Sequence, residues 1–543
     1  MRKRLWYTAP LSLIAVSVLA ALLAVTASAQ SSASNASGTL NFGSAGADVD
    51  FTDPALAYGV LSWQIEYETC LQLVNYPDKT GAAGSQLQPD AAAAMPVISN
   101  GGKTYTFTIK KGLKFSDGAT VSPADFVWAF NRDANPAMQS PVIPFITDVV
   151  GVNDVVNKKA KAVTGVKADG QKFIINLTKP DGALLAKLTM PFFCAVERAK
   201  TPIDPKGLNT LPGAGPYYIA SRTPGKQLVL KKNPFYKGDR PARSSTMVFT
   251  MNTNDQQTYL QVTNGTYAAD PNGLDVPTAA AGLAKKYGIN KSRFWVNSLV
   301  ETDYLALNTA NKAFGSLAAR KAANYAVDRP AVLRARGFEG GVRTSTILPK
   351  ALAGGYWGQK IYATKGADPA KAKQLNPNCG HVNLWGGNTT LAQTQEGIVR
   401  YNLTQAGCDV TVKQFGGYAI YTAAGTKGAD FDIMFSGWNQ DYPDPIDFFG
   451  ILLDGRNIHA QNNNNLAYIN NAELNKKIDQ ANAITGEGRL KAFGKLDIWT
   501  TTHLAPWVSI DNRNLRDYIG PNVAGYVFQP AKAAMDLGTL YLK

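Results

Sequence analysis

The segment 431–445 gathers the side chains best suited to bind a ligand. An apolar run at 431–435 leads into a loop with an indole, three polar side chains, a tyrosine and a Pro-Asp-Pro exit that stiffens it. A tryptophan offers apolar area and one N–H donor, and an aspartate can hold an ammonium group through charge-assisted hydrogen bonds. Trp438, Asp441 and Tyr442 are therefore candidate binding residues.

The same residues also fit a purely structural loop, with Trp438 in the core and Asp441 and Asp444 capping turns. The surrounding pattern is strand, helix, strand, strand, which is typical of a parallel sheet covered by helices. These elements are expected at 382–384, 389–406, 410–413 and 431–435. Ligands of such sheets lie beyond the carboxyl ends of the strands, which is where the loop begins. On residue types alone, both interpretations stay open.

Catalytic motifs are missing from the sequence. The chain has three histidines, far apart, and neither a zinc-protease nor a nucleophile-elbow motif. The stretch 102–104 lacks the upstream glycine of a phosphate loop, and 213–215 lacks the third glycine of a dinucleotide site. The sequence thus predicts a protein that is not an enzyme, with no metal and no cofactor.

Local signals define further elements. A helix is expected to begin at Ser122, because Ser122 can act as N-cap, Pro123 suits the first turn and Asp125 completes a capping box. Alternation of apolar and polar residues predicts a strand at 103–110. Further strands are expected at 172–178, 227–231, 247–251 and 505–510, and further helices at 314–327, 474–483 and 489–501.

Size and composition indicate a packed protein of two to four domains. The chain has 543 residues, of which 45% are hydrophobic and 17% charged. The formal net charge is +15, but the basic residues are scattered. A nucleic-acid binder would carry a clustered basic stripe, so no nucleic-acid partner is expected. The charge favours a solvated surface or contact with anionic cell-surface polymers or membranes.

The amino-terminal residues predict export. A basic head, an apolar run at 11–25 and the small residues Ala27, Ser28 and Ala29 match a secretory signal peptide over 1–29. The alternative is a retained anchor, although the run is short for a span of about 20 residues. A Ser/Ala/Asn linker follows at 30–38, without a lipid-anchor cysteine. We expect an extracytoplasmic protein, in a periplasm or at a cell surface.

Four cysteines in an exported chain suggest disulfides. Cys379 and Cys408 each precede a strand-like run, and neighbouring parallel strands would bring their starts together. Cys70 and Cys194 would then form the other bridge. Three connectivities are possible, and buried free thiols are the alternative to all of them.

The sequence around Asp441 resembles a family signature. Residues 438–445 match the W-x-x-D-Y-x-D-P pattern of the extracellular solute-binding proteins of family 5, the dipeptide- and oligopeptide-binding group. The resemblance extends in order over about 38–543. Its further blocks are 89–90 with 104–132, 213–217 with 228–236, and 304–309 with Arg320 and 324–329.

The resemblance implies an α/β fold of two lobes joined by a hinge, as in periplasmic binding proteins, with mixed sheets flanked by helices and a ligand cleft between the lobes. Lobe I would comprise 38–300 plus 505–543, with an extra subdomain at about 76–199. Lobe II would comprise 301–504. Ligand binding would favour a closed form through hinge motion.

The resemblance also implies roles for single residues. Asp441 would receive the α-ammonium of a peptide beside Trp438, and backbone groups near Gly437 and Asn439 would pair with the extended ligand. Trp385 and Asn388 follow a predicted strand and are expected to face the same cleft.

The expected function is that of a monomeric binding protein that delivers peptides to the permease of an ABC importer. One alternative keeps this fold and role with a non-peptide ligand, such as an oligosaccharide, an opine-like compound or a metal chelate. A secreted hydrolase and a sensory or adhesive protein are the alternatives from other classes.

Overall fold

The computed structural model describes residues 38–46, 48–362, 365–484 and 487–543. The predicted signal peptide at 1–29 lies outside the described residues, as does the predicted linker except for Gly38. None of the helices in the described ranges has the length and hydrophobicity that crossing a bilayer requires. Within these ranges, the predicted combination of mixed sheets and flanking helices is confirmed.

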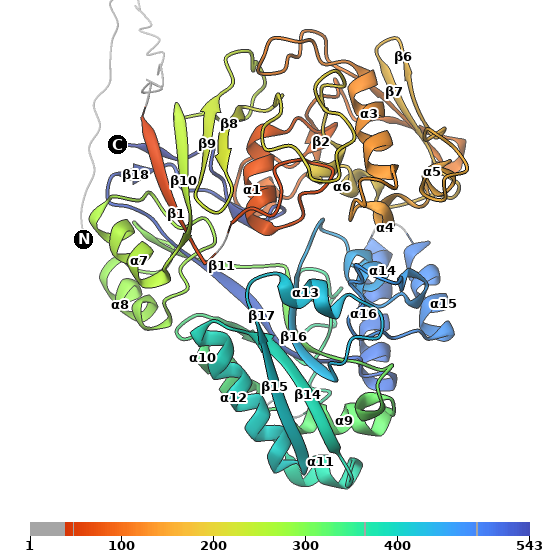
Figure 1. Cartoon of the computed structure of the whole chain (residues 1–543), viewed down its shortest axis with the longest axis vertical. Coiled ribbons are helices and arrows are strands. Elements are labelled where there is room, and N and C mark those ends of the chain that lie inside the picture. Colours follow the sequence, from red (N-terminus) through yellow and green to blue (C-terminus); the bar gives the residue numbers. More distant parts are fainter. Residues whose placement is uncertain (1–37, 47, 363–364, 485–486) are drawn as a thin grey trace, which may run out of the picture. The chain divides into compact units, whose positions relative to one another are not determined.

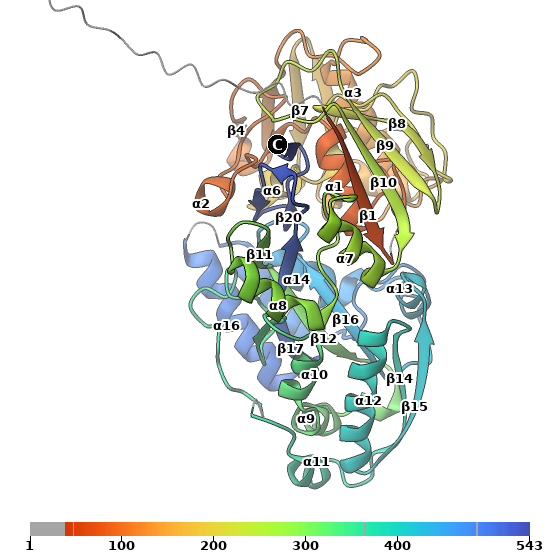
Figure 2. The same cartoon turned by 90° about the vertical axis from the view of Figure 1, so that its left-hand side faces the viewer.

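A four-stranded sheet forms from residues on either side of 100–200. Its order is β1-β10-β9-β8, with β1 parallel to β10 and the other pairs antiparallel. Figure 2 shows these strands side by side. Alternate residues point into the core, where Phe42 stacks on Phe249 at 4.8 Å between ring centroids. The bounds are β1 Thr39–Ala45, β8 Tyr217–Thr223, β9 Gln227–Lys232 and β10 Thr246–Thr253.

An antiparallel sheet of order β4-β5-β7-β6 lies within the predicted extra subdomain. Helix α3 (Pro123–Ala134) contacts β6 and β7, and its Phe126 and Phe130 pack on Phe173. The predicted capping box is confirmed, since the Ser122 backbone N–H donates to Asp125 Oδ2 at 2.7 Å. The strands are β4 Val97–Ser99, β5 Thr104–Thr108, β6 Val166–Asp169 and β7 Lys172–Asn176.

Seven of the described strands form the largest sheet. Its order is β11-β17-β12-β16-β14-β15, and β13 pairs with β17. The predicted strand, helix, strand, strand pattern is confirmed: β14 is parallel to β15 and β16, and α12 (Thr390–Gln405) lies beside β14 and β15 (Figure 1). The strands are β11 Phe294–Ser298, β12 Glu301–Leu307, β13 Gly341–Arg343, β14 Gly380–Gly387, β15 Cys408–Phe415, β16 Ile433–Asn439 and β17 Trp507–Tyr518.

Strand β17 bears on the predicted lobe boundaries. Its first half pairs with β12, where Asp511 faces Asp303, and its second half pairs with β11, where Tyr518 faces Phe294. A strand assigned to lobe I therefore belongs to the same sheet as β12 and β16, which were assigned to lobe II. The boundaries themselves stay a prediction.

The remaining described elements are short strand pairs and connecting helices. The strand pairs are β2 Val74–Asn75 with β3 Gln88–Pro89, β18 Val523–Ala524 with β21 Tyr541–Leu542, and β19 Phe528–Gln529 with β20 Ala534–Met535. The α-helices are α1 Val60–Thr69, α2 Gly81–Gly84, α4 Ile143–Ile146, α5 Val152–Val156, α6 Leu184–Lys187, α7 Asp255–Asn264, α8 Pro277–Tyr287, α9 Leu317–Ala326, α10 Arg329–Ala335, α11 Pro369–Leu375, α13 Ala419–Ala424, α14 Ile446–Leu452, α15 Ala472–Asn482 and α16 Glu487–His503. The 3-10 turns are Asn100–Gly102, Pro191–Phe193, Lys312–Phe314 and Gly455–Asn457.

Two disulfides join the four cysteines in the predicted pairs. Cys379 bonds Cys408 with 4.9 Å between their Cα atoms, because β14 and β15 run in parallel and begin side by side. Cys70 bonds Cys194 with a Cα separation of 5.5 Å, and this bridge ties the end of α1 to the segment after Pro191–Phe193.

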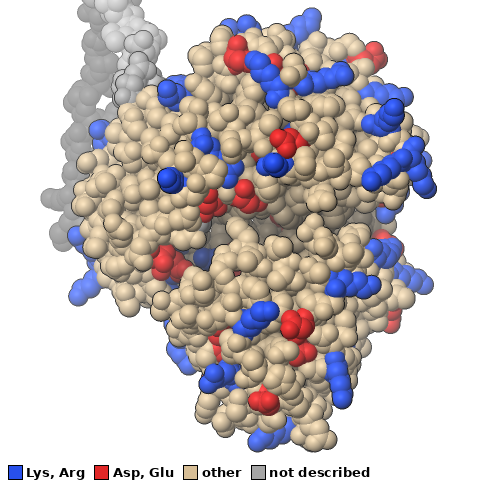
Figure 3. Space-filling model, in the orientation of Figure 1, with Lys and Arg blue, Asp and Glu red and all other residues tan. Residues whose placement is uncertain are grey.

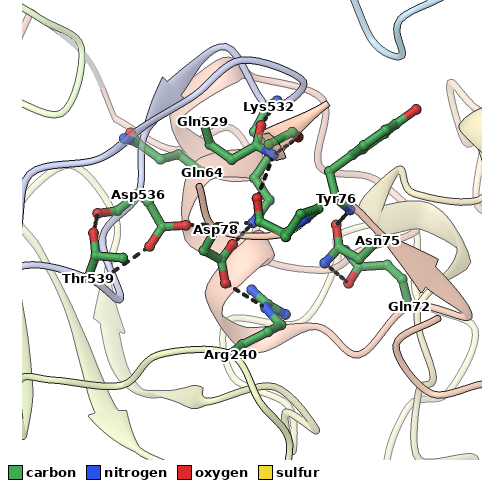
Figure 4. Close-up of polar contacts among 12 residues, drawn as sticks. Gln64, Gln72, Asn75, Tyr76, Asp78, Arg240, Gln529, Lys532, Asp536 and Thr539 are labelled. Atoms are coloured by element: carbon green, nitrogen blue, oxygen red, sulfur yellow. Dashed lines mark hydrogen bonds and ion pairs between the residues drawn. The ribbon is translucent and has the colours of Figure 1, made fainter. Parts of the chain in front are cut away.

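A buried polar network anchors the carboxyl-terminal segment 529–539 (Figure 4). Lys532 Nζ lies 2.5 Å from Asp78 Oδ1, and Arg240 Nε lies 3.6 Å from Asp78 Oδ2. The Gln529 amide donates to the carbonyl oxygens of Pro77 and Gly84. Residues near both ends of the described chain therefore share one core.

Candidate functional site

A cavity of about 630 Å³ opens between the seven-stranded sheet and residues of the amino- and carboxyl-terminal segments. Strands β12, β16 and β17 and helix α13 supply one part of its lining, and Tyr58, Val60, Asn272 and Ala533 supply another. In Figure 3 the surface is hollowed near its middle, while Lys and Arg are scattered over the same face. The cavity has the size of a small-molecule or peptide site.

Four of the predicted site residues meet at this cavity. Gly437, Trp438 and Asn439 come from the end of β16, and Asp441 comes from the turn that follows. Among the described residues, the β16 edge toward β14 is paired at Ile433 and Met434 and at no later position. Beyond Met434 this edge of β16 runs along the cavity without β14 as a neighbour, which leaves it accessible to an added strand.

The other three predicted residues are outside the set that lines the cavity, and their binding roles stay a prediction. The Trp385 indole packs between Phe415 and Phe431, with ring centroids 4.7 and 5.4 Å away. Tyr442 is buried and meets Phe145 edge to face at 6.1 Å. Asn388 follows β14 beside Phe415, to whose carbonyl oxygen its N–H donates at 3.0 Å. Aromatic packing, which the strand pattern does not specify, buries Trp385 and Tyr442, whereas Asn388 is exposed next to Gly387 of the lining.

Asp441 is held by both sides of the cavity. Tyr58 Oη donates to Asp441 Oδ2 at 2.7 Å, and the Asp441 backbone N–H donates to Asp447 Oδ2 at 2.9 Å. Trp438 Nε1 donates to the same Asp447 oxygen at 3.1 Å. Asp447 lies in the first turn of α14, where an acidic residue is a common helix feature. Its role was missed because the sequence offers that ordinary explanation.

Asp441, which is partly buried, and Asp447, which is fully buried, form a pair of neighbouring carboxyl groups. Burial raises the pKa of Asp441 to about 7, and the hydrogen bond from Tyr58 acts in the opposite direction. Burial and the charge of Asp441 hold the pKa of Asp447 well above its usual value. Two close carboxylates resist joint ionisation, so a cation placed beside them would stabilise the doubly charged form.

A second charged group lines the cavity on β12 and β17. Glu301 and Asp303 alternate on β12, and Asp511 and Arg513 alternate on β17. Arg336, after α10, is bonded to Asp303. Burial, followed by the nearby charge of Asp303, raises the pKa of Glu301 to about 7 and that of Asp511 to about 8. Charged residues two positions apart in a strand lie on the same face of the sheet, so this polar face can be inferred from the sequence.

Two tyrosines on or next to α13 add aromatic surface. Tyr418 and Tyr421 line the cavity and remain 54% and 40% exposed. Such rings combine apolar contact area with a hydroxyl group. Within the described ranges, no three His, Cys, Asp or Glu residues are arranged to hold a metal ion.

Relatives share this chain's sequence over most of its length. Haem-binding protein A of Haemophilus influenzae is 25% identical over 465 residues, which cover 80% of each chain. The periplasmic oligopeptide-binding protein of the same species is 24% identical and covers 92% of each chain.

Solved structures confirm the predicted two-lobed class of fold. The clavulanic acid biosynthesis oligopeptide binding protein 2 matches with a TM-score of 0.81 at 22% identity, over 93% of this chain and 95% of that chain. The Haemophilus influenzae oligopeptide-binding protein in complex with RPPGFSPFR matches with a TM-score of 0.77 at 21% identity, over 93% and 99% of the two chains.

A family model defines the group. The model described as bacterial extracellular solute-binding proteins, family 5 middle, matches residues 86–460. This match includes the loop that carries Trp438 and Asp441, and it spans well over half of the sequence. The chain belongs to the bacterial extracellular solute-binding proteins of family 5.

Proposed function

We propose that this protein is the extracytoplasmic binding component of an ABC importer and that it captures peptides and delivers them to the permease. The observation that carries the proposal is the edge of β16 that β14 leaves unpaired among the described residues, which runs along the cavity and ends at the partly buried carboxyl group of Asp441. A strand edge can bind any extended backbone, and a carboxylate at its end selects a free α-ammonium group. The family and its named peptide-binding members support this assignment.

In the proposed complex, the ligand's α-ammonium lies against Asp441, and its backbone pairs with β16 near Gly437 and Asn439. Trp438 covers the first residues of the peptide. The protein acts by binding and release, as a monomer, and performs no reaction on the ligand.

The proposed lobes are 38–300 with 505–543, including an extra subdomain at about 76–199, and 301–504. The hinge would then comprise the two residues between β11 and β12 and the middle of β17, where this strand changes partners. The hydrogen bond from Tyr58 to Asp441 would join the lobes in the closed form. A ligand shifts the lobes only by binding the closed form more tightly than the open one.

Acetylating the peptide's amino terminus tests the proposal. Trialanine is expected to bind the purified protein, and N-acetyl-trialanine is expected to bind at least about 30-fold more weakly, because Asp441 would face a neutral amide. Isothermal titration calorimetry measures both affinities. Trialanine amide serves as the matched control at the other end of the peptide.

Two results would refute the peptide proposal. One is equal affinity for trialanine and its acetylated form. The other is binding of oligosaccharides, haem or metal chelates in the absence of any peptide binding. Mass spectrometry of ligand retained by the purified protein gives an independent answer.

The affinity for trialanine is expected to rise with pH up to neutrality and to fall again in alkaline solution. The ammonium needs an ionised Asp441, whose pKa in the free protein is raised to about 7 by burial. Affinity should therefore rise by up to about tenfold per pH unit from pH 5 to pH 7. It should fall again above about pH 8, where the ligand's α-amino group loses its proton. Calorimetry across pH 5–9 measures the profile, and an affinity that is flat between pH 5 and pH 7 contradicts it.

A further inference from the structure

The charged group on β12 and β17 occupies one face of the sheet beside the proposed peptide strand. Asp303 on β12 lies opposite Gly437 of the neighbouring strand β16 and, on its other side, opposite Asp511 of β17. Glu301 lies two residues before Asp303 and therefore shares its face. A Cβ atom at Gly437 would collide with the Asp303 carboxylate, so the glycine makes room for this acid next to the unpaired edge of β16.

The described lining of the cavity has more acidic than basic side chains. Its carboxylates are Glu301, Asp303, Asp441 and Asp511, and its cations are Arg336 and Arg513, without a lysine or histidine. The whole chain has the opposite balance, with a net charge of +15. Local acidity in a basic protein is the electrostatic complement of a cationic ligand.

Each of the two arginines lies beside an acid of the cavity, and Arg336 forms the closer pair. Arg336 is bonded to Asp303, and its Nε lies 3.8 Å from Asp511 Oδ2. Arg513 Nη1 lies 3.8 Å from Glu301 Oε1. An anionic ligand at Arg336 would have to displace the Asp303 carboxylate, so this part of the cavity is poorly suited to bind a carboxylate.

Asp511 lacks the donors that a buried carboxylate requires. It is fully buried among the described residues and lines the cavity, and no described residue donates a hydrogen bond to either of its oxygens. The 3.8 Å approach of Arg336 is too long for a hydrogen bond. A buried carboxylate without donors is costly, and a ligand with several N–H groups would remove that cost.

We propose that Glu301, Asp303 and Asp511 form a subsite for a guanidinium or ammonium side chain, so that the cleft selects peptides with a basic residue near their amino terminus. This inference rests on the proposed function. Gly437, beside the subsite, and Asp441 are four residues apart, which is at most about 13 Å along an extended strand. The basic side chain therefore belongs to one of the first four residues of the ligand. Its charge would displace the protons that the raised pKa values of Glu301 and Asp511 retain near neutral pH.

Neutral isosteres of arginine test the subsite in the wild-type protein. Four tetrapeptides carry arginine at position one, two, three or four among alanines, and four matched peptides carry citrulline instead. Calorimetry at pH 7.5 is expected to show at least tenfold tighter binding of the arginine peptide at one position or more. A ratio below three at all four positions overturns the inference. So does tighter binding of glutamate peptides than of their glutamine counterparts, which would assign the site to anions.

Variants then locate the effect. Glu301→Gln and Asp511→Asn are each expected to bring the arginine-to-citrulline ratio down at least threefold. Glu473→Gln, an exposed carboxylate on α15 outside the cavity lining, serves as the matched control and keeps the wild-type ratio. An undiminished ratio in both cavity variants overturns the assignment. If Asp511→Asn does not fold, Glu301→Gln and the comparison of arginine with citrulline peptides still test the proposed subsite.

The same titrations separate this inference from the proposed function. Failure of all tetrapeptides to bind refutes the proposed function. Binding of all tetrapeptides without an arginine preference refutes only the basic subsite.

Discussion

Asp441→Asn is expected to lower the affinity for trialanine by about 30- to 1000-fold. The substitution keeps the side chain's size but removes the charge that would compensate a buried ammonium, and loss of one partner from such a pair costs about 2–4 kcal/mol. Calorimetry at pH 7.5 measures the change. Asp409→Asn provides the matched control, because Asp409 is an exposed carboxylate on β15.

The same variant should fold at least as stably as the wild type. A carboxyl group whose pKa is raised by burial weakens the folded state once the pH exceeds its unfolded value near 4, and the loss accumulates until the pH reaches the folded value of about 7. The amide that replaces this carboxyl group does not titrate, so urea denaturation at pH 8 should give the variant a free energy of unfolding higher by at least about 1 kcal/mol.

Unchanged affinity of the Asp441→Asn variant for trialanine would refute the binding role of Asp441.

Arg132→Met is expected to lower the free energy of unfolding by about 3–5 kcal/mol. Arg132 is fully buried on α3 and forms two parallel hydrogen bonds with Asp53, at 2.8 and 2.7 Å. It also donates to the Pro202 carbonyl oxygen. Methionine fills the space but leaves the buried Asp53 charge without its cationic partner, with only backbone N–H donors remaining, which is the costly way to break an ion pair. Urea denaturation at pH 7 measures the loss.

Two further variants test whether the loss of stability comes from the unpaired buried charge. Adding Asp53→Asn to Arg132→Met should recover part of the lost stability, since it removes the unpaired charge. Arg456→Met breaks a pair of similar geometry with Asp454 and Asp479, but that arginine is half exposed, so the cost should stay below about 1 kcal/mol. A loss below about 1 kcal/mol for Arg132→Met would contradict the prediction.

Local sequence patterns predicted those parts of the fold that local chemistry determines. The capping box at Ser122 and Asp125 depends on residues three positions apart, and the structure contains it. The pairing of Cys379 with Cys408 followed from two adjacent parallel strands. The helix expected from residue 314 instead begins at Leu317, because Ser316 caps it by accepting the N–H of Ala319, while 312–314 form a separate 3-10 turn.

The candidate site was predicted only where it is contiguous in sequence. Gly437, Trp438, Asn439 and Asp441 reach the cavity together because one strand end and one turn carry them. The acids of β12 meet Asp511 only through strand pairing across some two hundred positions, a register that periodicity does not encode. Trp385, which was expected to follow the strand at 382–384, lies inside β14, and aromatic packing with Phe415 decides the direction of its indole.

The anchoring of segment 529–539 also determines when the protein can finish folding. Gln64 donates to the Met535 carbonyl oxygen across 471 positions, and Lys532 meets Asp78 across 454. At about 5–20 residues per second, the later partner is synthesised roughly half a minute to one and a half minutes after the earlier one. During that interval α1 and the buried acids near it lack their final neighbours, and closing so long a loop is itself slow. This core is therefore completed only after nearly all of the chain has been synthesised. Until then the chain lacks this core and can still be translocated in an incompletely folded state.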